Sequence, residues 1–71
     1  MNASTYTPAF SYGTRVVCVA TVDYGKTGRS TIIRILPNPS GREDKQWYDI
    51  RFEDGSLARV PSRDLVQDKA A

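Results

Sequence analysis

The fold is decided by the stretch Trp47-Tyr48-Asp49-Ile50-Arg51-Phe52, which leads through Glu53-Asp54-Gly55-Ser56 into Leu57-Ala58-Arg59-Val60. Apolar and polar residues alternate from position 47 to 52, so Tyr48, Ile50 and Phe52 share one face, and this period of two predicts a half-buried strand. Asp54-Gly55 supplies the positive backbone angles of a tight hairpin turn. The two segments are therefore predicted to form an antiparallel hairpin.

Two β-rich runs precede this hairpin. Residues 15 to 20, Arg-Val-Val-Cys-Val-Ala, are dominated by β-branched side chains and are too short for a stable helix, which favours a largely buried strand. Residues 30 to 36, Ser-Thr-Ile-Ile-Arg-Ile-Leu, have the same character, and we expect a strand there with Arg34 facing outward. The residues that this register directs toward the core are Thr31, Ile33 and Ile35.

The segment after the hairpin completes the set of strands. Pro61-Ser62-Arg63-Asp64-Leu65 suits one helical or 3-10 turn, in which Ser62 caps the turn and Leu65 returns to the core. Val66 then begins a last short strand. Five short strands with turn signals between them and no long helix predict an all-β chain, folded as a closed or nearly closed barrel.

The 71-residue chain has room for one small domain. We expect residues 1–11, rich in Ser, Thr, Asn and Pro, to form a flexible N-terminal arm, residues 12–66 the barrel, and residues 67–71 a disordered tail. The single cysteine, Cys18, excludes an intramolecular disulfide, and without histidine the usual zinc ligand sets are absent. No metal, cofactor or catalytic residue is therefore expected, and the chain is predicted not to be an enzyme.

Several partner classes are disfavoured by the sequence. No hydrophobic run approaches the roughly 20 residues of a membrane helix, and the N-terminus lacks the basic and apolar segments of a signal peptide, so we expect a cytoplasmic protein without a membrane partner. Gly25-Lys26-Thr27 has Ala20 where a phosphate-binding loop has glycine, and a β-rich run follows it. No nucleotide or other small-molecule substrate is expected.

Two segments carry a family resemblance. Residues 13 to 35 combine a Gly-polar-x-Val-x-Val opening, a basic Gly-Lys-x-Gly loop and an Ile-rich strand, with Arg29-Ser30-Thr31 between the second glycine and the apolar run. Residues 48 to 65 read Tyr-x-Ile-x-Phe-x-Asp-Gly-Ser-x-x-x-Val-Pro-x-x-x-Leu. Together they resemble the KOW motif and the Tudor-like members of the SH3-like barrels, which occur in ribosomal proteins and transcription elongation factors. The resemblance implies a small five-stranded SH3-like barrel with one short 3-10 turn, in a ribonucleoprotein or transcription-related assembly.

Charge is distributed unevenly along a chain whose formal net charge is +2. Residues 12–36 carry a balance of +3, residues 37–54 of −2 and residues 55–71 of +1. The candidate nucleic-acid-binding residues in the basic part are Tyr24, Lys26, Arg29 and Arg34. Cations neutralise phosphates and an aromatic face stacks on an unpaired base, so this group predicts contact with RNA or DNA. The alternative is a polar β-turn without a ligand.

Trp47 is expected on the polar face of its strand, together with Asp49 and Arg51. An outward tryptophan beside charged residues predicts an anchor for a larger protein complex, so these three residues form a candidate protein-interaction site. Alternatively, Trp47 covers an open end of the barrel against the N-terminal arm, with Tyr6 or Phe10 as its contact. Two functions remain open: a nucleic-acid-binding module, or an interaction or regulatory subunit that docks on a protein complex.

Overall fold

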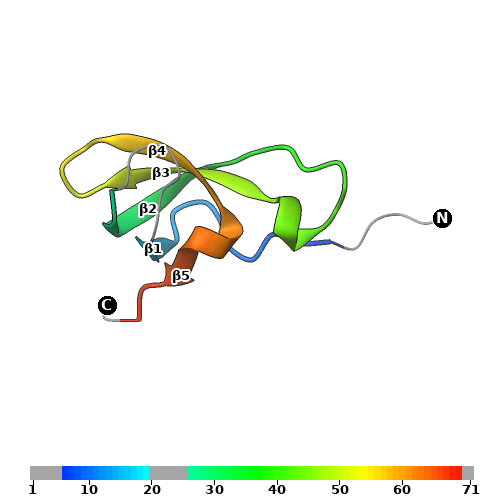
Figure 1. Ribbon diagram of the computed structural model, residues 1–71, viewed down its shortest axis with the longest axis horizontal. Helices are drawn as coiled ribbons and strands as arrows, with labels where there is room; N and C mark the ends of the chain where they lie inside the picture. The colour runs from blue at the N-terminus through cyan, green and yellow to red at the C-terminus, as the bar shows by residue number, and fades with distance from the viewer. Residues whose placement is uncertain (1–5, 20–25, 70–71) are drawn as a thin grey trace.

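The structure, a computed structural model, describes residues 6–19 and 26–69. Its five strands form one antiparallel sheet in the order β4-β3-β2-β1-β5 (Figure 1). The strands are β1 (Arg15–Cys18), β2 (Gly28–Ile35), β3 (Trp47–Phe52), β4 (Leu57–Pro61) and β5 (Leu65–Gln67). Two 3-10 helices, η1 (Glu43–Lys45) and η2 (Ser62–Asp64), precede β3 and β5, so the described residues contain one such turn more than predicted.

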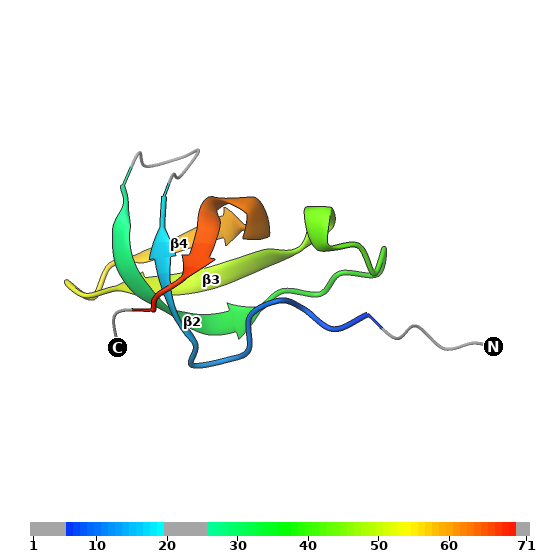
Figure 2. The ribbon, with the colours of Figure 1, turned by 90° about the horizontal axis from the view of Figure 1, so that it is seen from below.

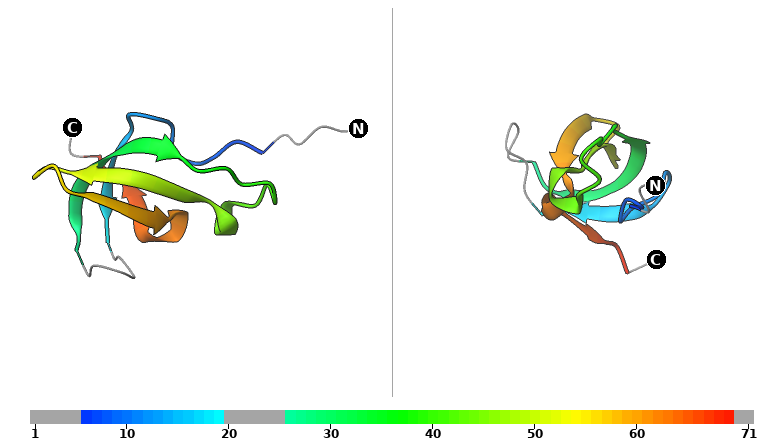
Figure 3. Two further views of the ribbon diagram at one scale, coloured as in Figure 1. Left: turned by 90° about the horizontal axis from the view of Figure 1, so that it is seen from above. Right: turned by 90° about the vertical axis from the view of Figure 1, so that its right-hand side faces the viewer.

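The sheet is strongly bent. Residues 28–31 of β2 pair with β1 and residues 30–35 pair with β3, and β2 curves along its length (Figure 2). Viewed from the end, the strands curl around a common interior (Figure 3). β4 and β5 stand at the two ends of the strand order, and the chain links them through η2. The predicted fold class, an all-β chain that forms a small five-stranded SH3-like barrel, is confirmed.

The core is built from alternate residues of the strands, as a period of two requires. β3 contributes Tyr48, Ile50 and Phe52, the three side chains predicted to share one face, and Val16 and Cys18 of β1 are fully buried. The other buried apolar residues of this cluster are Ile32, Ala58, Val60 and Leu65. Burial of each large apolar side chain contributes about 1.5–3 kcal/mol, so the cluster is the main source of stability.

In the first part of β2, the residues that face the core differ from those predicted. Ser30 and Ile32 are buried, whereas Thr31 and Ile33 are only partly buried, so the prediction that Thr31 and Ile33 face the core is wrong. The reason is the register of β2 against β1, in which Ser30 lies opposite the core residue Val16. Directly opposite residues of a strand pair point to the same side of the sheet.

A β-bulge at Ile33 reverses the alternation in the second part of β2. Between positions 32 and 34 the β2–β3 ladder advances two residues on β2 and one on β3, which leaves Ile33 as an extra residue. Beyond the bulge Arg34 is exposed and Ile35 packs against the core, and both orientations agree with the prediction.

The hairpin between β3 and β4 is confirmed, but its turn is of another type. The amide of Gly55 donates to the carbonyl of Phe52 (2.9 Å), and the amide of Phe52 donates to the carbonyl of Ser56 (2.8 Å). Gly55 has a positive φ of 90°, whereas Asp54 does not have a positive φ. Residues 53 to 55 therefore form a three-residue loop with glycine at the left-handed position, in place of a two-residue turn.

The predicted turn after β4 is present as η2, and Leu65 is buried as expected. The prediction that Ser62 caps this turn is wrong, because Pro61 occupies the N-cap position and makes no side-chain capping bond. The hydroxyl of Ser62 donates instead to the carboxylate of Glu43 in η1. The bond joins the two 3-10 helices, which lie side by side at one end of the barrel.

Both ends of the described chain contact the barrel. The ring of Phe10 packs edge-on against Tyr48, with 5.6 Å between ring centres, and its amide donates to the Tyr48 hydroxyl (3.2 Å). β5 ends at Gln67, one residue inside the segment expected as a tail. The amide of Asp68 then donates to the carbonyl of Arg15 (3.1 Å). Phe10 and Asp68, which lie outside the expected barrel boundaries at residues 12 and 66, thus contact the barrel.

Candidate nucleic-acid interface

Lys26 lies two residues before β2, and its side chain reaches the turn between β3 and β4. The ammonium group donates to the Asp54 carboxylate and to Ser56 Oγ (2.7 Å), and it lies 5.0 Å from the centre of the Phe52 ring. The hydrogen bond from Lys26, followed by those from Ser56, holds the pKa of Asp54 well below its usual range. Lys26 is thus engaged beside a core residue. Tyr24, the aromatic member of the predicted group, lies outside the described residues.

Arg29 and Arg34 project from the outer side of β2, away from the core, and both are exposed. A strand rises about 3.3–3.4 Å per residue, so the two lie at most about 17 Å apart along β2. The Nε atom of Arg29 lies 3.6 Å from Oδ2 of Asp68. The structure therefore places Arg29 and Arg34 on the outer side of β2, whereas Lys26 binds residues of the β3–β4 turn.

Three further arginines lie on the outer side of the sheet. The register places Arg15 of β1 and Arg51 of β3 opposite Thr31 of β2, one on each side of it, and Arg59 of β4 opposite Asp49 of β3. These side chains all point to the outer, convex side of the bent sheet, where neighbouring strands are about 4.8 Å apart. We name this surface the arginine face and define it by Arg15, Arg29, Arg34, Arg51 and Arg59.

Arg15 and Arg59 are not among the site residues predicted from the sequence, and Arg51 is predicted there as part of a protein-interaction site. A signal was present, because each of the three is next to a buried residue of a strand and must face outward. The cross-strand register, which decides that they meet on one surface, was not predicted.

The members of the arginine face differ in their acidic partners. Among the described residues, Arg34 and Arg51 have none. The Nη2 atom of Arg15 lies 3.4 Å from Oε2 of Glu53, and about half of the Arg15 side chain is exposed (49%). Exposed ion pairs contribute about 0–1 kcal/mol, so Arg15 exchanges its carboxylate for another anion at little cost.

A hollow of about 360 Å³ opens on the arginine face. The residues that line it are Ile33, Asp49, Leu57, Ala58 and Arg59. Arg59 donates to both carboxylate oxygens of Asp49, from Nε at 2.8 Å and from Nη2 at 3.4 Å. These hydrogen bonds raise the pKa of Arg59 and neutralise the negative charge at this point of the surface. Leu57 is 59% exposed beside the pair.

Trp47 begins β3 on the side of Asp49 and Arg51, opposite to the buried Tyr48, and it is 37% exposed. Its cross-strand neighbour on β4 is Pro61. The structure therefore brings together the three residues predicted as a protein-interaction site, and it places them on the same surface as Arg29 and Arg34.

The aromatic residues considered as contacts of Trp47 have other partners. The Tyr6 hydroxyl lies 2.8 Å from Oε1 of Glu43 and 3.0 Å from Oε1 of Gln46. Burial and the hydrogen bond to Glu43 raise the pKa of Tyr6 to about 12. Phe10 packs against Tyr48. The N-terminal segment thus covers the η1 end of the barrel.

Gln46 is buried just before β3 and makes three side-chain hydrogen bonds at the start of that strand. Its Nε2 atom donates to the carbonyls of Leu36 (2.8 Å) and Trp47 (2.9 Å), and its Oε1 atom accepts from Nδ2 of Asn38 (3.2 Å). Gln46 is not among the residues predicted from the sequence, because a single glutamine before a strand carries no pattern. The buried amide links the β2–η1 connection to the strand that presents Trp47.

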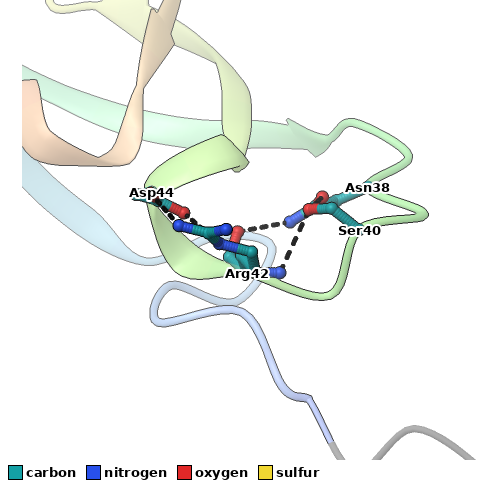
Figure 4. Close-up of polar contacts among 4 residues, drawn as sticks. All are labelled: Asn38, Ser40, Arg42 and Asp44. Carbon is teal, nitrogen blue, oxygen red and sulfur yellow. Dashed lines mark hydrogen bonds and ion pairs between the residues drawn. The ribbon is translucent and has the colours of Figure 1, made fainter.

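The loop between β2 and η1 is organised by its own side chains (Figure 4). Nδ2 of Asn38 donates to the carbonyl of Arg42 (2.8 Å), and the Ser40 hydroxyl donates to Oδ1 of Asn38 (2.6 Å). The guanidinium group of Arg42 donates to both oxygens of Asp44, at 3.1 and 2.9 Å. Arg42 is therefore paired with Asp44 of η1 and is not a member of the arginine face.

The described residues offer no other cluster of reactive or metal-binding side chains. Cys18 is buried, with its Sγ atom 3.8 Å from the carbonyl of Lys26. Within residues 6–19 and 26–69, no three side chains of His, Cys, Asp or Glu gather as metal ligands, and no helix has the length and apolar character to cross a membrane. Neither the protein-family models, nor the curated proteins, nor the solved structures contain a match to this chain.

Proposed function

We propose that this chain is a non-enzymatic nucleic-acid-binding module that holds the phosphate backbone of RNA or DNA on the arginine face. The observation that carries the proposal is the cross-strand register, which gathers arginines of four neighbouring strands on one outward surface. Guanidinium groups bind phosphates through paired, charge-assisted hydrogen bonds, which makes arginine well suited to this contact.

The balance of charges supports weak, salt-sensitive binding. Arg34 and Arg51 have no acidic partner among the described residues, and the exposed ion pair of Arg15 is readily exchanged for a phosphate. Each phosphate that is neutralised contributes about 0.7–0.9 to the slope of log affinity against log salt concentration. Such contacts read the backbone and not the base sequence. The resemblance to KOW and Tudor-like barrels adds a ribonucleoprotein or transcription-related assembly as the setting.

The proposal is tested by fluorescence anisotropy of labelled RNA and DNA oligonucleotides at low salt and then at rising salt. The double variant Arg34→Glu/Arg51→Glu is expected to bind roughly tenfold more weakly or worse, because two attractive contacts become repulsive. The matched control is Lys45→Glu/Arg63→Glu, which reverses two exposed charges in η1 and η2, outside the arginine face. Absence of binding at low salt, or an equal loss in both double variants, contradicts the proposal.

A second candidate function is docking on a larger protein complex, and the hollow favours it. Leu57 is exposed at its edge, and a concave, partly apolar site with fixed polar groups is typical of an interaction pocket. Leu57→Ser is then expected to abolish co-purification of the protein partner and to leave oligonucleotide binding unchanged. Retention of every partner by Leu57→Ser excludes the hollow as the contact.

A further inference from the structure

Trp47 stands at one end of the arginine face, beside Arg34, for which the described residues offer no acidic partner. Arg34 lies opposite Asp49 in the β2–β3 ladder, and Trp47 lies two residues before Asp49 on the same side of β3. Such diagonal neighbours are about 7–8 Å apart, within reach of an aromatic and a long side chain. Trp47 is 37% exposed and Arg34 is exposed, so both of these neighbouring side chains are accessible to a ligand.

The backbone at Trp47 is held in place. Its carbonyl accepts hydrogen bonds from the amide of Leu36 (3.1 Å) and from Nε2 of Gln46 (2.9 Å). Gln46 is 1% exposed, so the second donor is itself fixed by burial. The backbone that presents the ring therefore needs no rearrangement when a planar ligand stacks on Trp47, which keeps the cost of binding low.

The acid between Trp47 and Arg51 does not repel an anion. Asp49 points to the same side of β3 as these two residues, but both of its carboxylate oxygens accept hydrogen bonds from Arg59. The outward groups along β3 are therefore the Trp47 ring, the Asp49–Arg59 ion pair without net charge, and the cationic Arg51. They are spread over about 13 Å. Arg34 adds a second cation beside these groups.

Building on the proposed function, we propose that the ligand of this surface is a single-stranded nucleic acid, one base of which stacks on Trp47 while neighbouring phosphates bind Arg34 and Arg51. In a duplex the faces of the bases are stacked on one another, and only their edges are accessible in the grooves. An unpaired base offers its face, and every base has one, so the contact tolerates any sequence. The aromatic ring next to free cations thus selects single strands over duplexes.

Trp47 is the only tryptophan of the chain, so intrinsic tryptophan fluorescence reports on this residue alone. The full chain is titrated at low salt with a thymidine oligonucleotide, with the same oligonucleotide paired to its complement, and with linear polyphosphate, a polyanion without bases. The single strand is expected to quench the fluorescence and to bind more tightly than the duplex. Polyphosphate is expected to bind without quenching, because it reaches only the arginines.

Variants of Trp47 complete the test, with circular dichroism to confirm that they fold. Trp47→Ala is expected to bind the single strand roughly 5- to 150-fold more weakly, the range that stacking of one base gives, while its affinity for polyphosphate is unchanged. Trp47→Phe is expected to recover part of the affinity.

The outcomes separate the two proposals. If neither nucleic acid binds, the nucleic-acid function itself fails. If the single strand binds but leaves the fluorescence of Trp47 unchanged, or binds Trp47→Ala as tightly as wild type, only the stacking proposal is overturned. Tighter binding of the duplex than of the single strand also overturns the stacking proposal. In that case Trp47 contacts no base and is available to a protein partner.

Discussion

Replacement of Glu43 by alanine is expected to lower the free energy of unfolding by roughly 2–4 kcal/mol. The Glu43 carboxylate accepts hydrogen bonds from the hydroxyls of Tyr6 (2.8 Å), Tyr48 (3.4 Å) and Ser62, and from the amide of Ala9 (3.2 Å). These donors belong to the N-terminal segment, to β3 and to η2. One side chain of η1 therefore connects three separate parts of the chain.

The magnitude follows from the burial of the donors. A hydrogen bond contributes about 0.5–1.5 kcal/mol net, and a buried group left without its partner costs about 1–3 kcal/mol. Tyr48 is fully buried and Ser62 partly buried, so these two account for most of the loss, whereas the exposed amide of Ala9 adds little. A chain of this size has a stability of about 4–10 kcal/mol. The variant is therefore expected to melt roughly 10–25 °C below wild type.

Asp44→Ala is the matched control, because it removes a carboxylate from the next residue of η1. Asp44 pairs with Arg42, and both side chains are largely exposed, at 60% and 68%, so the expected loss is below about 0.5 kcal/mol. Urea denaturation followed by circular dichroism measures both variants. Equal destabilisation by the two substitutions would refute the reasoning, since Glu43 would then act only as a surface charge.

Four further predictions concern charge, pH and the core. Arg51→Gln is expected to reduce the slope of log affinity against log salt by about 0.7 for single-stranded DNA in the anisotropy assay, and an unchanged slope means that Arg51 touches no phosphate. Glu53→Gln releases Arg15 and is expected to tighten binding by up to about fivefold, whereas weaker binding would contradict the assignment. The pKa of Tyr6 is about 12 in the folded chain and about 10 in the unfolded chain. The free energy of unfolding is therefore expected to fall as the pH rises from about 10 to about 12. Denaturation at a series of pH values should show a smaller fall for Tyr6→Phe than for wild type. Ser30→Ala is expected to raise the free energy of unfolding by about 1 kcal/mol, because the buried Ser30 hydroxyl has no hydrogen-bond partner in the described part of the chain, and a lower melting temperature would be the contrary result.

The strands were predictable where the residue pattern is regular. In β3 large apolar residues alternate with polar ones, and the side chains predicted on one face are the buried ones. In β2 the apolar residues Ile32 and Ile33 are adjacent, so the pattern does not say which of them faces the core. The answer depends on the pairing with β1 and β3, which is a long-range property.

The candidate site was predictable only in part, for the same reason. Lys26 and Arg29 are close in the sequence, but Lys26 reaches the β3–β4 turn and Arg29 lies on the outer side of β2. Arg15 and Arg51 are 36 positions apart in the chain, yet both lie opposite Thr31. The closeness of charged residues along the sequence therefore does not predict which of them share a surface. Alternation within each strand, combined with the register between strands, does predict it.

The polar cluster at the η1 end had no sequence signal at all. Tyr6 meets Glu43 and Gln46 across 37 and 40 positions of the chain. Polar residues in a loop and in an N-terminal segment carry no periodicity that would reveal such a contact. The contact is long-range and depends on the whole fold.

The β-bulge at Ile33 explains both why Ile33 does not face the core as predicted and why Arg34 lies on the arginine face. In the first part of β2 the residues at positions 30 and 32 face the core, and without an extra residue position 34 would face it too. An arginine there would be buried among apolar side chains without a partner, which is strongly unfavourable. The insertion of Ile33 turns Arg34 to the outer side, next to Trp47, and returns Ile35 to the core. Bulges redirect side chains in this way beside binding sites. The insertion of Ile33 therefore breaks the alternation of β2 and, by doing so, places Arg34 on the arginine face.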